Sequence, residues 1–299
     1  MDQYFVPVSI GIPVYNGERY LEESLESFLA QTFREFELII CDNASTDRTS
    51  KICGSFAARD ARIRYVRNPT NVGAAANYRL AFELSHGKYF KWATYDDICA
   101  PEFVARCVGV LDTNPTVALA YTRTKLIDAE GQVYQEYQDD LDLGDSRPSE
   151  RFVGLLERLK LCNALYGLIR ADVLRRTALL ASFIASDVPL LAELALYGKF
   201  HEVQEFLFFR RIHAAAGSSI PQEDLVMEFY DPKRKGTIPF TECRHFGAHV
   251  RSVSRAPLGM AERLRLVRIL WRLGLNNRAK LAREISWGAR RMLWKLRNG

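Results

Sequence analysis

The chain has 299 residues, of which 48% are hydrophobic and 26% charged, a composition typical of a globular protein with one large domain or two smaller ones. Its net charge of +5 is uneven, because residues 251–299 carry thirteen Lys and Arg against two Glu, or +11, which leaves −6 for residues 1–250. Six scattered cysteines without a Cys-x-x-Cys pair argue against a zinc site, and the lack of a long apolar stretch or a basic start followed by an apolar run predicts neither a transmembrane helix nor a signal peptide.

The first hundred residues alternate between apolar, β-branched runs and segments with helical periodicity. We expect strands at 6–14, 36–41, 63–66 and 88–95, and helices at 18–32, 46–59 and 74–85. Ser45 or Thr46 would cap the second helix, and Gly87 would be the C-cap glycine of the third. Strands and helices that alternate with short connections predict an α/β fold with a parallel sheet and helices on both faces.

Two adjacent carboxylates, Asp96 and Asp97, end the fourth predicted strand. In an open α/β sheet, ligands bind at the carboxyl ends of the strands, so this pair lies where a site is expected. Two neighbouring carboxylates repel each other, and a cation such as Mg²⁺ or Mn²⁺, which also binds phosphates, would relieve that repulsion. The alternative is that the pair forms only a loop and cap before a helix that begins near Pro101.

Polar residues follow the other predicted strands as well. Tyr15 and Asn16 follow the first strand, Asp42 the second and Asn71 the third. Because the strands are expected to be parallel, these side chains can converge on one crevice. Neither a Gly-x-Gly-x-x-Gly nor a Gly-Lys-Ser/Thr motif follows any strand, so a metal on carboxylates is the expected device for holding phosphates.

Taken together, these segments resemble the family 2 glycosyltransferases. The resemblance rests on Ile12 to Glu18, Leu29 to Phe33, Cys41 to Asp47, Asn68 to Gly73 with Asn77, Gly87 to Tyr89, and Asp96-Asp97, which occur in the family's order and spacing over about the first 100 residues. The chain departs from the family at Asn43-Ala44, where a second Asp and a Gly are usual. It also departs at Tyr95, where a further Asp is common.

The resemblance implies a GT-A fold and transfer of a sugar from a nucleotide-sugar, of UDP or dTDP type, with inversion at the anomeric carbon. It places Pro13 and Tyr15 beside the base, has Asp42 accept from a base N–H, and puts Asp96 by the ribose and phosphates. Asp97 would hold the Mg²⁺ or Mn²⁺. The donor-binding set is completed by Asn16, Glu18 and Asn71.

The second part of the sequence predicts a helix at 101–111, a strand at 117–121, a turn at 127–132, a loop at 135–150 and helix from 151. The family resemblance makes this part the acceptor half, with a short strand at 165–170. Five acidic residues of the loop are interpreted as a solvated surface: Glu136, Asp139, Asp140, Asp142 and Asp145.

Asp187 is the candidate general base, because the segment 185–199 resembles the family's acidic residue and following helix. An acceptor hydroxyl needs a positioned carboxylate to take its proton. The alternative is a helix N-cap before Pro189.

His213 ends a strand at 206–213 that resembles the family's Arg-x-x-His segment, where the His approaches the metal or diphosphate. A plain surface histidine is the alternative, and 214–219 is expected to be a mobile loop.

The last eighty residues are interpreted as a basic helical extension. Signals are weak at 220–255, and helices are expected at 260–273 and 278–296. Basic helices with Trp271, Trp287 and Trp294 suit an anionic membrane surface. The alternatives are packing on the catalytic domain and nucleic-acid binding, for which no known motif is present.

We therefore predict a GT-A domain at 1–219, with a nucleotide-binding half at 1–100 and an acceptor half at 101–219, and a C-terminal helical extension at 220–299. The acceptor would be a hydroxyl of a glycan or lipid-linked molecule. The expected place is the cytoplasm or the inner face of a membrane, as a monomer or a homo-oligomer. Two alternatives are an inactive GT-A-like scaffold and a nucleotidyltransferase, although the latter needs a basic fingerprint that residues 12–16 lack.

Overall fold

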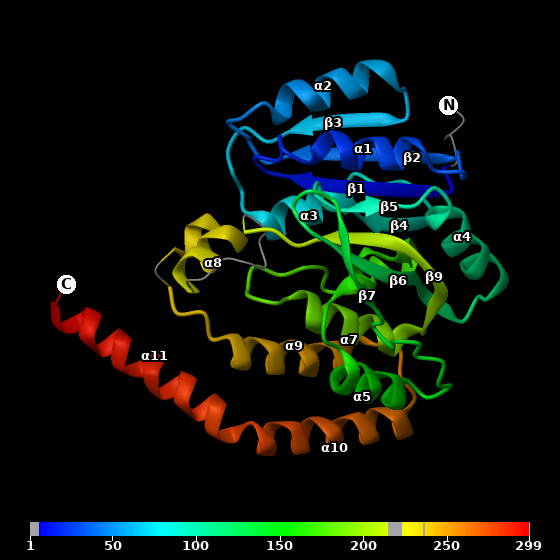
Figure 1. Ribbon diagram of the computed structural model, residues 1–299. Helices are drawn as coiled ribbons and strands as arrows, with labels where there is room; N and C mark the ends of the chain where they lie inside the picture. Colours follow the sequence, from blue (N-terminus) through cyan, green and yellow to red (C-terminus); the bar gives the residue numbers. More distant parts are fainter. Residues whose placement is uncertain (1–5, 215–222, 236, 299) are drawn as a thin grey trace, which may run out of the picture.

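The computed structural model describes residues 6–214, 223–235 and 237–298. A single mixed sheet runs through the molecule in the order β3-β2-β1-β4-β8-β6-β9-β5, with β7 paired to β6 (Figure 1). Helices cover both faces of the sheet, and the helices of the last quarter of the chain lie along one side of this body. No described helix is long and apolar enough to cross a membrane.

The first half of the chain forms the parallel part of the sheet. Its strands are β1 (Val8–Val14), β2 (Phe36–Asp42), β3 (Ile63–Arg67) and β4 (Tyr89–Trp92), and its helices are α1 (Leu21–Leu29), α2 (Thr49–Arg59) and α3 (Ala74–Glu83). The predicted alternation is confirmed. Every residue of β1 is buried, which explains why the strand is apolar along its whole length rather than on alternate positions.

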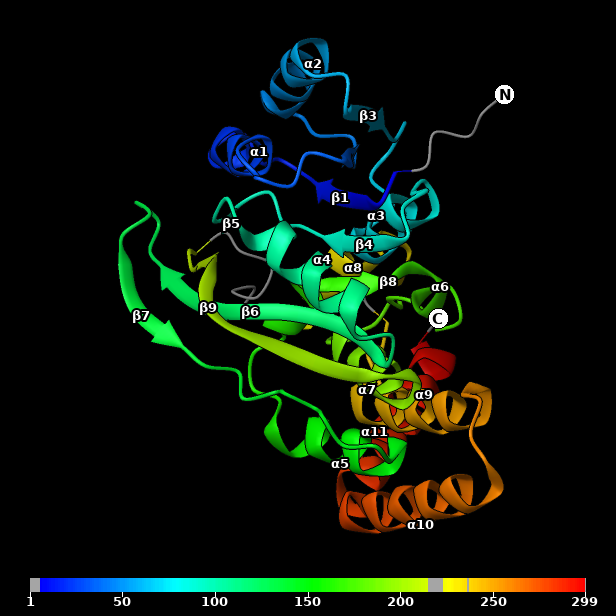
Figure 2. The same cartoon turned by 90° about the vertical axis from the view of Figure 1, so that its right-hand side faces the viewer.

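The second half extends the sheet with strands of both directions. It contains β5 (Ile98–Cys99), α4 (Phe103–Thr113), β6 (Val117–Ile127), β7 (Val133–Tyr137), α5 (Pro148–Arg158), the 3₁₀ turn η1 (Asn163–Tyr166), β8 (Leu168–Arg170), α6 (Ala171–Leu174), α7 (Asp187–Tyr197) and β9 (Lys199–Arg211). β6 is longer than predicted because it pairs with β8, β9 and β7 in turn. The predicted turn at 127–132 is confirmed, and Figure 2 shows β7 standing out from the body beyond it.

The loop predicted at 135–150 is shorter in the structure. β7 continues to Tyr137 and α5 begins at Pro148, which lies at the first helical position as its fixed φ favours. The short strand predicted at 165–170 is present as β8, where Leu168 and Ile169 pair with β6.

Two predictions about helix ends were wrong. The C-cap of α3 is Leu84, and Gly87 instead allows close approach to β1, since a Cβ there would lie 2.6 Å from the backbone nitrogen of Ser9. The N-cap of α2 is Arg48, not Ser45 or Thr46. Both hydroxyl residues lie earlier in the loop because that loop bonds to the end of β1 rather than to the helix.

The C-terminal helices are α8 (Glu223–Tyr230), the 3₁₀ turn η3 (Pro232–Arg234), α9 (Thr241–Arg255), α10 (Met260–Asn276) and α11 (Arg278–Asn298). The two last helices are confirmed close to their predicted bounds. α9 was not predicted, because the prolines at 221, 232 and 239 suggested broken structure and the helix begins only after the last of them. The predicted loop at 214–219 lies outside the described residues from 215 onward.

α9 and α10 share a hydrophobic core with the body of the molecule. Val253 of α9 and Leu266 and Leu270 of α10 belong to the same buried cluster as Phe152 of α5 and the leucines of α7. A second cluster lies on the other face of the sheet, between β1, β2 and helices α1, α2 and α4. α9 and α10 therefore pack on the body of the molecule. Such packing was one of the alternatives to membrane binding that the sequence left open for the basic helices.

Both acidic residues of the segment 251–299 accept hydrogen bonds from the N-termini of other helices. Glu262 accepts a hydrogen bond from the Ser149 N–H at the start of α5, at 3.0 Å. Glu284 accepts from the N–H groups of Glu242 and Cys243 at the start of α9, both at 3.0 Å. A carboxylate at a helix N-terminus satisfies free N–H groups and interacts favourably with the helix dipole. These two contacts consume the only negative side chains of the segment.

Candidate active site

A cavity of about 810 Å³ opens at the carboxyl ends of β1 and β4, where the parallel strands meet the start of α7 and the helix α8. This is the volume range of a site for a molecule the size of a nucleotide. Seven of the ten predicted site residues line it: Pro13, Tyr15, Asn16, Asn71, Asp96, Asp97 and Asp187. The prediction that loops at the strand ends converge on one crevice is confirmed for these residues.

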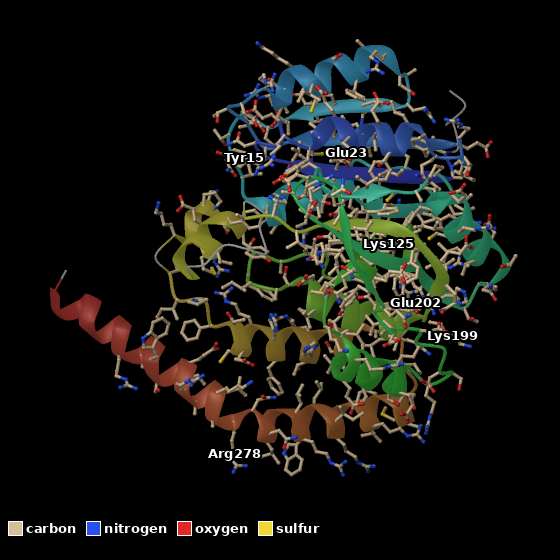
Figure 3. The ribbon with its side chains drawn as sticks, viewed as in Figure 1. Tyr15, Glu23, Lys125, Lys199, Glu202 and Arg278 are labelled. Atoms are coloured by element: carbon tan, nitrogen blue, oxygen red, sulfur yellow. The ribbon has the colours of Figure 1, made fainter. Side chains whose placement is uncertain are left out.

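One end of the cavity is formed by the loop after β1. Tyr15 is 42% exposed there, and Figure 3 shows it at the end of the strand, away from the body of the sheet. Asn16 has φ 51°, a left-handed conformation that Asn tolerates better than most residues. Its N–H donates to the Ser45 hydroxyl at 2.9 Å, and its side-chain oxygen accepts from the Thr46 N–H at 2.8 Å. The loops after β1 and β2 are thereby held together.

Asparagine side chains form a network behind this end of the cavity. Asn43 donates to the side-chain oxygen of Asn71 at 2.8 Å and accepts from the Val72 N–H at 2.9 Å. Asn68 donates to both Asn43 and Asn77. The wall formed by Asn43 and Asn71 is therefore fixed before any ligand binds, which lowers the entropy lost on binding.

Asp42 and Glu18 do not line the cavity. Asp42 is fully buried, and its two oxygens accept from the Ser45 N–H at 2.8 Å and the Tyr65 hydroxyl at 2.9 Å. Glu18 accepts from the backbone and side chain of Arg48. Both carboxylates hold the loop after β2 in place.

Ala44 stands where the family usually has glycine. Its φ is 63°, a left-handed conformation. Glycine adopts this conformation freely, whereas the Cβ of alanine clashes with the backbone there. Ala44→Gly is therefore expected to raise the free energy of unfolding by about 1 kcal/mol. Urea titration of both chains measures this. Gly73→Ala, at φ 87°, is the reverse control and should destabilise the protein, whereas a less stable Ala44→Gly variant would contradict the strain.

The carboxylate pair predicted from the sequence lines the cavity. Asp97 is buried and accepts from the Thr94 hydroxyl at 2.5 Å and from the Arg211 N–H at 2.8 Å. The Asp96 carboxylate lies 2.8 Å from Nε2 of His213. His213 is outside the cavity lining but is brought to the pair, so the alternative of a plain surface histidine is not what the structure shows, since its side chain is only 5% exposed.

The electrostatics of the pair favour a cation. Burial, and then the charge of Asp96, raise the pKa of Asp97 to about 7. Within the described part of the chain no three His, Cys, Asp or Glu side chains are arranged to hold an ion unaided. Two carboxylates next to an imidazole nevertheless fit Mg²⁺ or Mn²⁺, because such ions commonly use one or two carboxylates and complete their shell with water and substrate phosphates.

Arg211 joins the parts of the site that come from distant segments. Its side chain is 2% exposed and donates to the Asp96 carbonyl at 2.9 Å, to the carbonyls of Asp128 and Ala129 in the β6–β7 turn, and to Glu23 of α1. Four of the five N–H groups of its guanidinium bind other residues of the protein, so Arg211 mainly positions the carboxylate pair.

Arg210, which the sequence prediction did not name, supplies positive charge to the cavity lining. Burial opposes its charge, but Tyr166 and Asp97 outweigh this and raise the pKa of Arg210. Its guanidinium donates to the side-chain oxygen of Asn163 at 2.7 Å, and Asn163 donates in turn to Asp139 at 3.1 Å. The feature of the sequence that could have identified Arg210 was its position next to Arg211, near the end of the predicted strand at 206–213.

Asp139 corrects the interpretation of the acidic loop as wholly solvated. Its side chain is buried, with the residue 3% exposed, because β7 and the loop after it fold back over η1 and carry Asp139 onto Asn163. Burial raises the pKa of Asp139 to about 7, against the opposing effect of the Asn163 hydrogen bond. It therefore anchors Asn163, and through it Arg210, rather than facing water.

The buried Asp139 predicts a pH dependence of stability. The folded state holds its proton more tightly than the unfolded chain, so its contribution is fully present below about pH 4 and is lost as the pH rises through about 7. Asp139→Asn removes this loss, and its stability relative to the wild type should grow by about 2 to 3 kcal/mol between about pH 5 and pH 8. Urea unfolding across that range tests it. Parallel profiles for the two chains would contradict a raised pKa.

Asp187 lies on the other side of the cavity, at the first residue of α7. The N-cap is its neighbour Ser186, and the Asp187 carboxylate accepts from the Val188 N–H at 3.0 Å and is hydrogen-bonded to the Cys162 thiol. Burial, and then the Asp187 charge, raise the pKa of the adjacent Cys162 thiol well above its ordinary value. Asp187 is thus a charged group with acceptor capacity toward the cavity.

Part of the cavity wall comes from the C-terminal extension, which was not predicted. Glu228, Phe229 and Tyr230 of α8 line it together with Tyr78 and Tyr166 of the body. The Tyr230 carbonyl lies so close to Gly73 that a Cβ there would approach it to 2.5 Å. Only the irregular composition of 220–255 was visible in the sequence, so nothing marked these residues as part of the site.

A sheet whose parallel half carries a nucleotide-sized cavity at its strand ends, lined by a carboxylate pair and by a further carboxylate from a helix start, fits a glycosyltransferase of the GT-A type. Residues 9–176, more than half of the chain, match the model of "Glycosyl transferase family 2", and the chain belongs to that family. Among curated relatives, an uncharacterized glycosyltransferase of Methanocaldococcus jannaschii is 29% identical over 135 residues. These cover 44% of this chain and 47% of the relative, so the chain spans about half of that protein's length.

Solved structures show the same fold at low identity. S. aureus TarS 1–349 in complex with UDP has a TM-score of 0.63 at 15% identity and covers 90% of this chain and 72% of that one. The mannosyltransferase PcManGT from Pyrobaculum calidifontis, in complex with GDP-Man and Mn²⁺, has a TM-score of 0.53 at 18% identity and covers 98% and 88%. The fold and the enzyme class predicted from the sequence are therefore confirmed.

Proposed function

We propose that this glycosyltransferase transfers a sugar from a nucleoside diphosphate sugar to a hydroxyl group, with inversion and with the help of Mg²⁺ or Mn²⁺. The observation that carries the proposal is that one cavity is lined by Tyr15, by the pair Asp96 and Asp97, and by Asp187 at the start of α7. A donor, an ion and a base each have a place in it.

The donor is proposed to be of UDP or dTDP type. Pro13 and Tyr15 border the base, the exposed Tyr15 ring provides a stacking surface, and Asn16 and Asn71 face the same end of the cavity. Acceptance of a base N–H by Asp42 stays a prediction, because this carboxylate is buried outside the cavity lining and already binds Ser45, Tyr65 and Arg67. Glu18 is proposed to act indirectly, by holding Arg48 and the loop after β2. TarS was crystallised with UDP and with UDP-GlcNAc, which makes UDP-sugars the first donors to test.

Asp97 and His213 are the proposed metal ligands, with Asp96 beside the ribose and phosphates. When bound, the ion would neutralise negative charge on the leaving diphosphate. Arg210 is proposed to help neutralise the same diphosphate charge, because its guanidinium lines the cavity and is held in place by a hydrogen bond to Asn163. The Arg211 N–H and the Thr94 hydroxyl fix the orientation of the Asp97 carboxylate.

Asp187 is the proposed general base. The acceptor oxygen attacks the anomeric carbon on the face opposite the diphosphate, the bond from that carbon to the phosphate oxygen breaks, and the acceptor proton goes to Asp187. One carboxylate on the acceptor side suffices for such a single displacement, whose outcome is inversion. A Mn²⁺-dependent thermal shift across a panel of nucleotide-sugars identifies the donor, because a ligand that binds only the folded state raises Tm. A panel without any shift would remove the support for a nucleotide-sugar donor.

The acceptor is proposed to be a glycan or a lipid-linked glycan, as in surface polysaccharide synthesis, and the enzyme is proposed to work in the cytoplasm at a membrane. Residues 251–299, with their charge of +11, would attach it to anionic lipid. We expect the acceptor to bind against three aromatic residues that line the cavity, Tyr166 and the α8 residues Phe229 and Tyr230, because aromatic rings pack well on sugar rings.

A further inference from the structure

Helix α10 has two apolar faces, of which only one is used inside the protein. The inner face buries Leu266 and Leu270 in the core shared with α5 and α7. The other face, which we call the outer stripe, consists of five exposed side chains: Met260 at 72%, Leu264 at 51%, Val267 at 52%, Trp271 at 65% and Leu275 at 39%. Steps of three and four residues place them in one row along the helix.

The charges next to the outer stripe are all of one sign. Arg268 and Arg272 are exposed, and no acidic side chain in the described ranges pairs with either of them. Arg265 is exposed as well and pairs only with Glu262, which is itself committed to the start of α5. Figures 1 and 3 show α10 at the outer margin of the molecule, with Arg278 just past its end directed away from the body. The face is therefore apolar along its centre and cationic along its side.

We propose that the outer stripe of α10 lies in the headgroup region of an anionic membrane, with Arg268 and Arg272 on lipid phosphates. The inference rests on the proposed membrane attachment of residues 251–299 and narrows it to one helix face. Helices that lie on membranes combine such an apolar row with flanking arginines, and Trp favours the headgroup level. From Met260 to Leu275 the row is about 22 Å long, at 1.5 Å per residue, and can lie flat on a bilayer.

Two other occupants fit this face less well. A second copy of the chain, packed stripe to stripe across a two-fold axis, would bring Arg268 and Arg272 close to their own copies with no acid on the face to pair with them. A nucleic acid would match the arginines but would leave Leu264 and Val267 against a polar backbone. Anionic lipid satisfies both the charge and the apolar row.

Helix α11 does not offer an equivalent row within its described side chains. Its exposed large apolar residues, Ile285 and Trp287, are two positions apart and therefore about 200° apart around the helix. They cannot both lie on one flat surface. Among the described side chains, those of α10 thus form the exposed apolar row that matches a membrane plane.

The test is co-sedimentation of the full chain with vesicles of equimolar phosphatidylcholine and phosphatidylglycerol, and with phosphatidylcholine alone. The wild type is expected to bind only the anionic vesicles and to lose binding as salt is added. Leu264→Ser with Trp271→Ser should weaken binding at least about tenfold. Arg268→Gln with Arg272→Gln should weaken it about tenfold to thirtyfold at low salt, at about one lipid contact per arginine.

Matched controls keep the result specific. Ile285→Ser removes an exposed apolar residue from α11, and Lys51→Gln with Arg59→Gln removes two charges from α2 at the opposite end of the molecule (Figure 1). These variants should bind as the wild type does. All variants should keep the wild-type rate on a soluble acceptor, because none of the residues lines the cavity. Their Tm should stay close to that of the wild type, because all the residues are exposed and the Arg59–Glu26 ion pair that one control removes lies on the surface.

Three outcomes would overturn the inference. If the Leu264→Ser, Trp271→Ser chain binds anionic vesicles like the wild type while the full chain binds well, attachment of 251–299 stands and the α10 face is wrong. If the wild type ignores anionic vesicles, both proposals fail. If the wild type is instead a dimer by light scattering and the stripe variant is a monomer, the occupant is a second copy.

Discussion

Asp187→Asn is expected to lower kcat by a factor of about 10² to 10⁴, the range typical for loss of a general base, while the Kd for the donor stays nearly unchanged. Asparagine keeps the side-chain oxygen that accepts from the Val188 N–H at 3.0 Å, so the start of α7 should not be disturbed. What it loses is the capacity to take a proton. Initial rates at saturating donor and acceptor, together with calorimetric donor binding, separate the two quantities.

Asp172→Asn is the matched control for this variant. Asp172 lies in the first turn of the short helix α6, is exposed, and does not line the cavity, so its loss changes charge at a helix start without touching the reaction. Its kcat should equal that of the wild type. If Asp187→Asn instead abolished donor binding or lowered Tm sharply, Asp187 would belong to the donor site or to the packing of α7, and the base would have to be sought elsewhere.

Asp97→Asn is the second change with a large expected effect. Activity should fall by a factor on the order of 10³, because charge stabilisation by a bound ion is worth several kcal/mol in a transition state. The fold should survive, since the amide oxygen can still accept from the Arg211 N–H and the amide can donate to the Thr94 hydroxyl. Asp97→Ala should be equally inactive but also less stable, because it leaves the Arg211 N–H without a buried partner.

The role of the ion itself has a separate readout. Titration of Mn²⁺ into the protein with UDP present should show binding to the wild type and much weaker binding to Asp97→Asn. Asp112→Asn, at a surface carboxylate that binds Lys88 and Tyr89, serves as the control and should bind Mn²⁺ normally. Wild-type activity that persists in excess EDTA would refute metal dependence, and the site would then rely on Arg210 for the leaving diphosphate.

Much of the site follows from the order of residues along the chain. Tyr15, Asn71 and Asp96 are far apart in the sequence, yet each comes after an apolar run that is predicted to be a buried strand. Parallel strands bring their carboxyl ends to one edge, so the topology alone makes these residues neighbours. α10 is equally predictable, because its apolar residues recur with helical spacing.

The local sequence pattern could not predict which distant segments each residue would pack against. Asp139 lies in an acidic stretch, and only the return of the chain over η1 buries it against Asn163. The α8 residues Phe229 and Tyr230 have no motif, and the packing of α8 beside α3 makes them a cavity wall.

The same holds for the two faces of α10. The sequence determined that this helix is amphipathic and basic, because periodicity is a property of neighbouring residues. Helical spacing puts Leu264, Val267, Leu270 and Trp271 on one side of it. The tertiary structure divided them, with Leu270 inside the core and the other three exposed. Burial depends on what distant segments pack against a residue, and α5 and α9 cover only one side of α10.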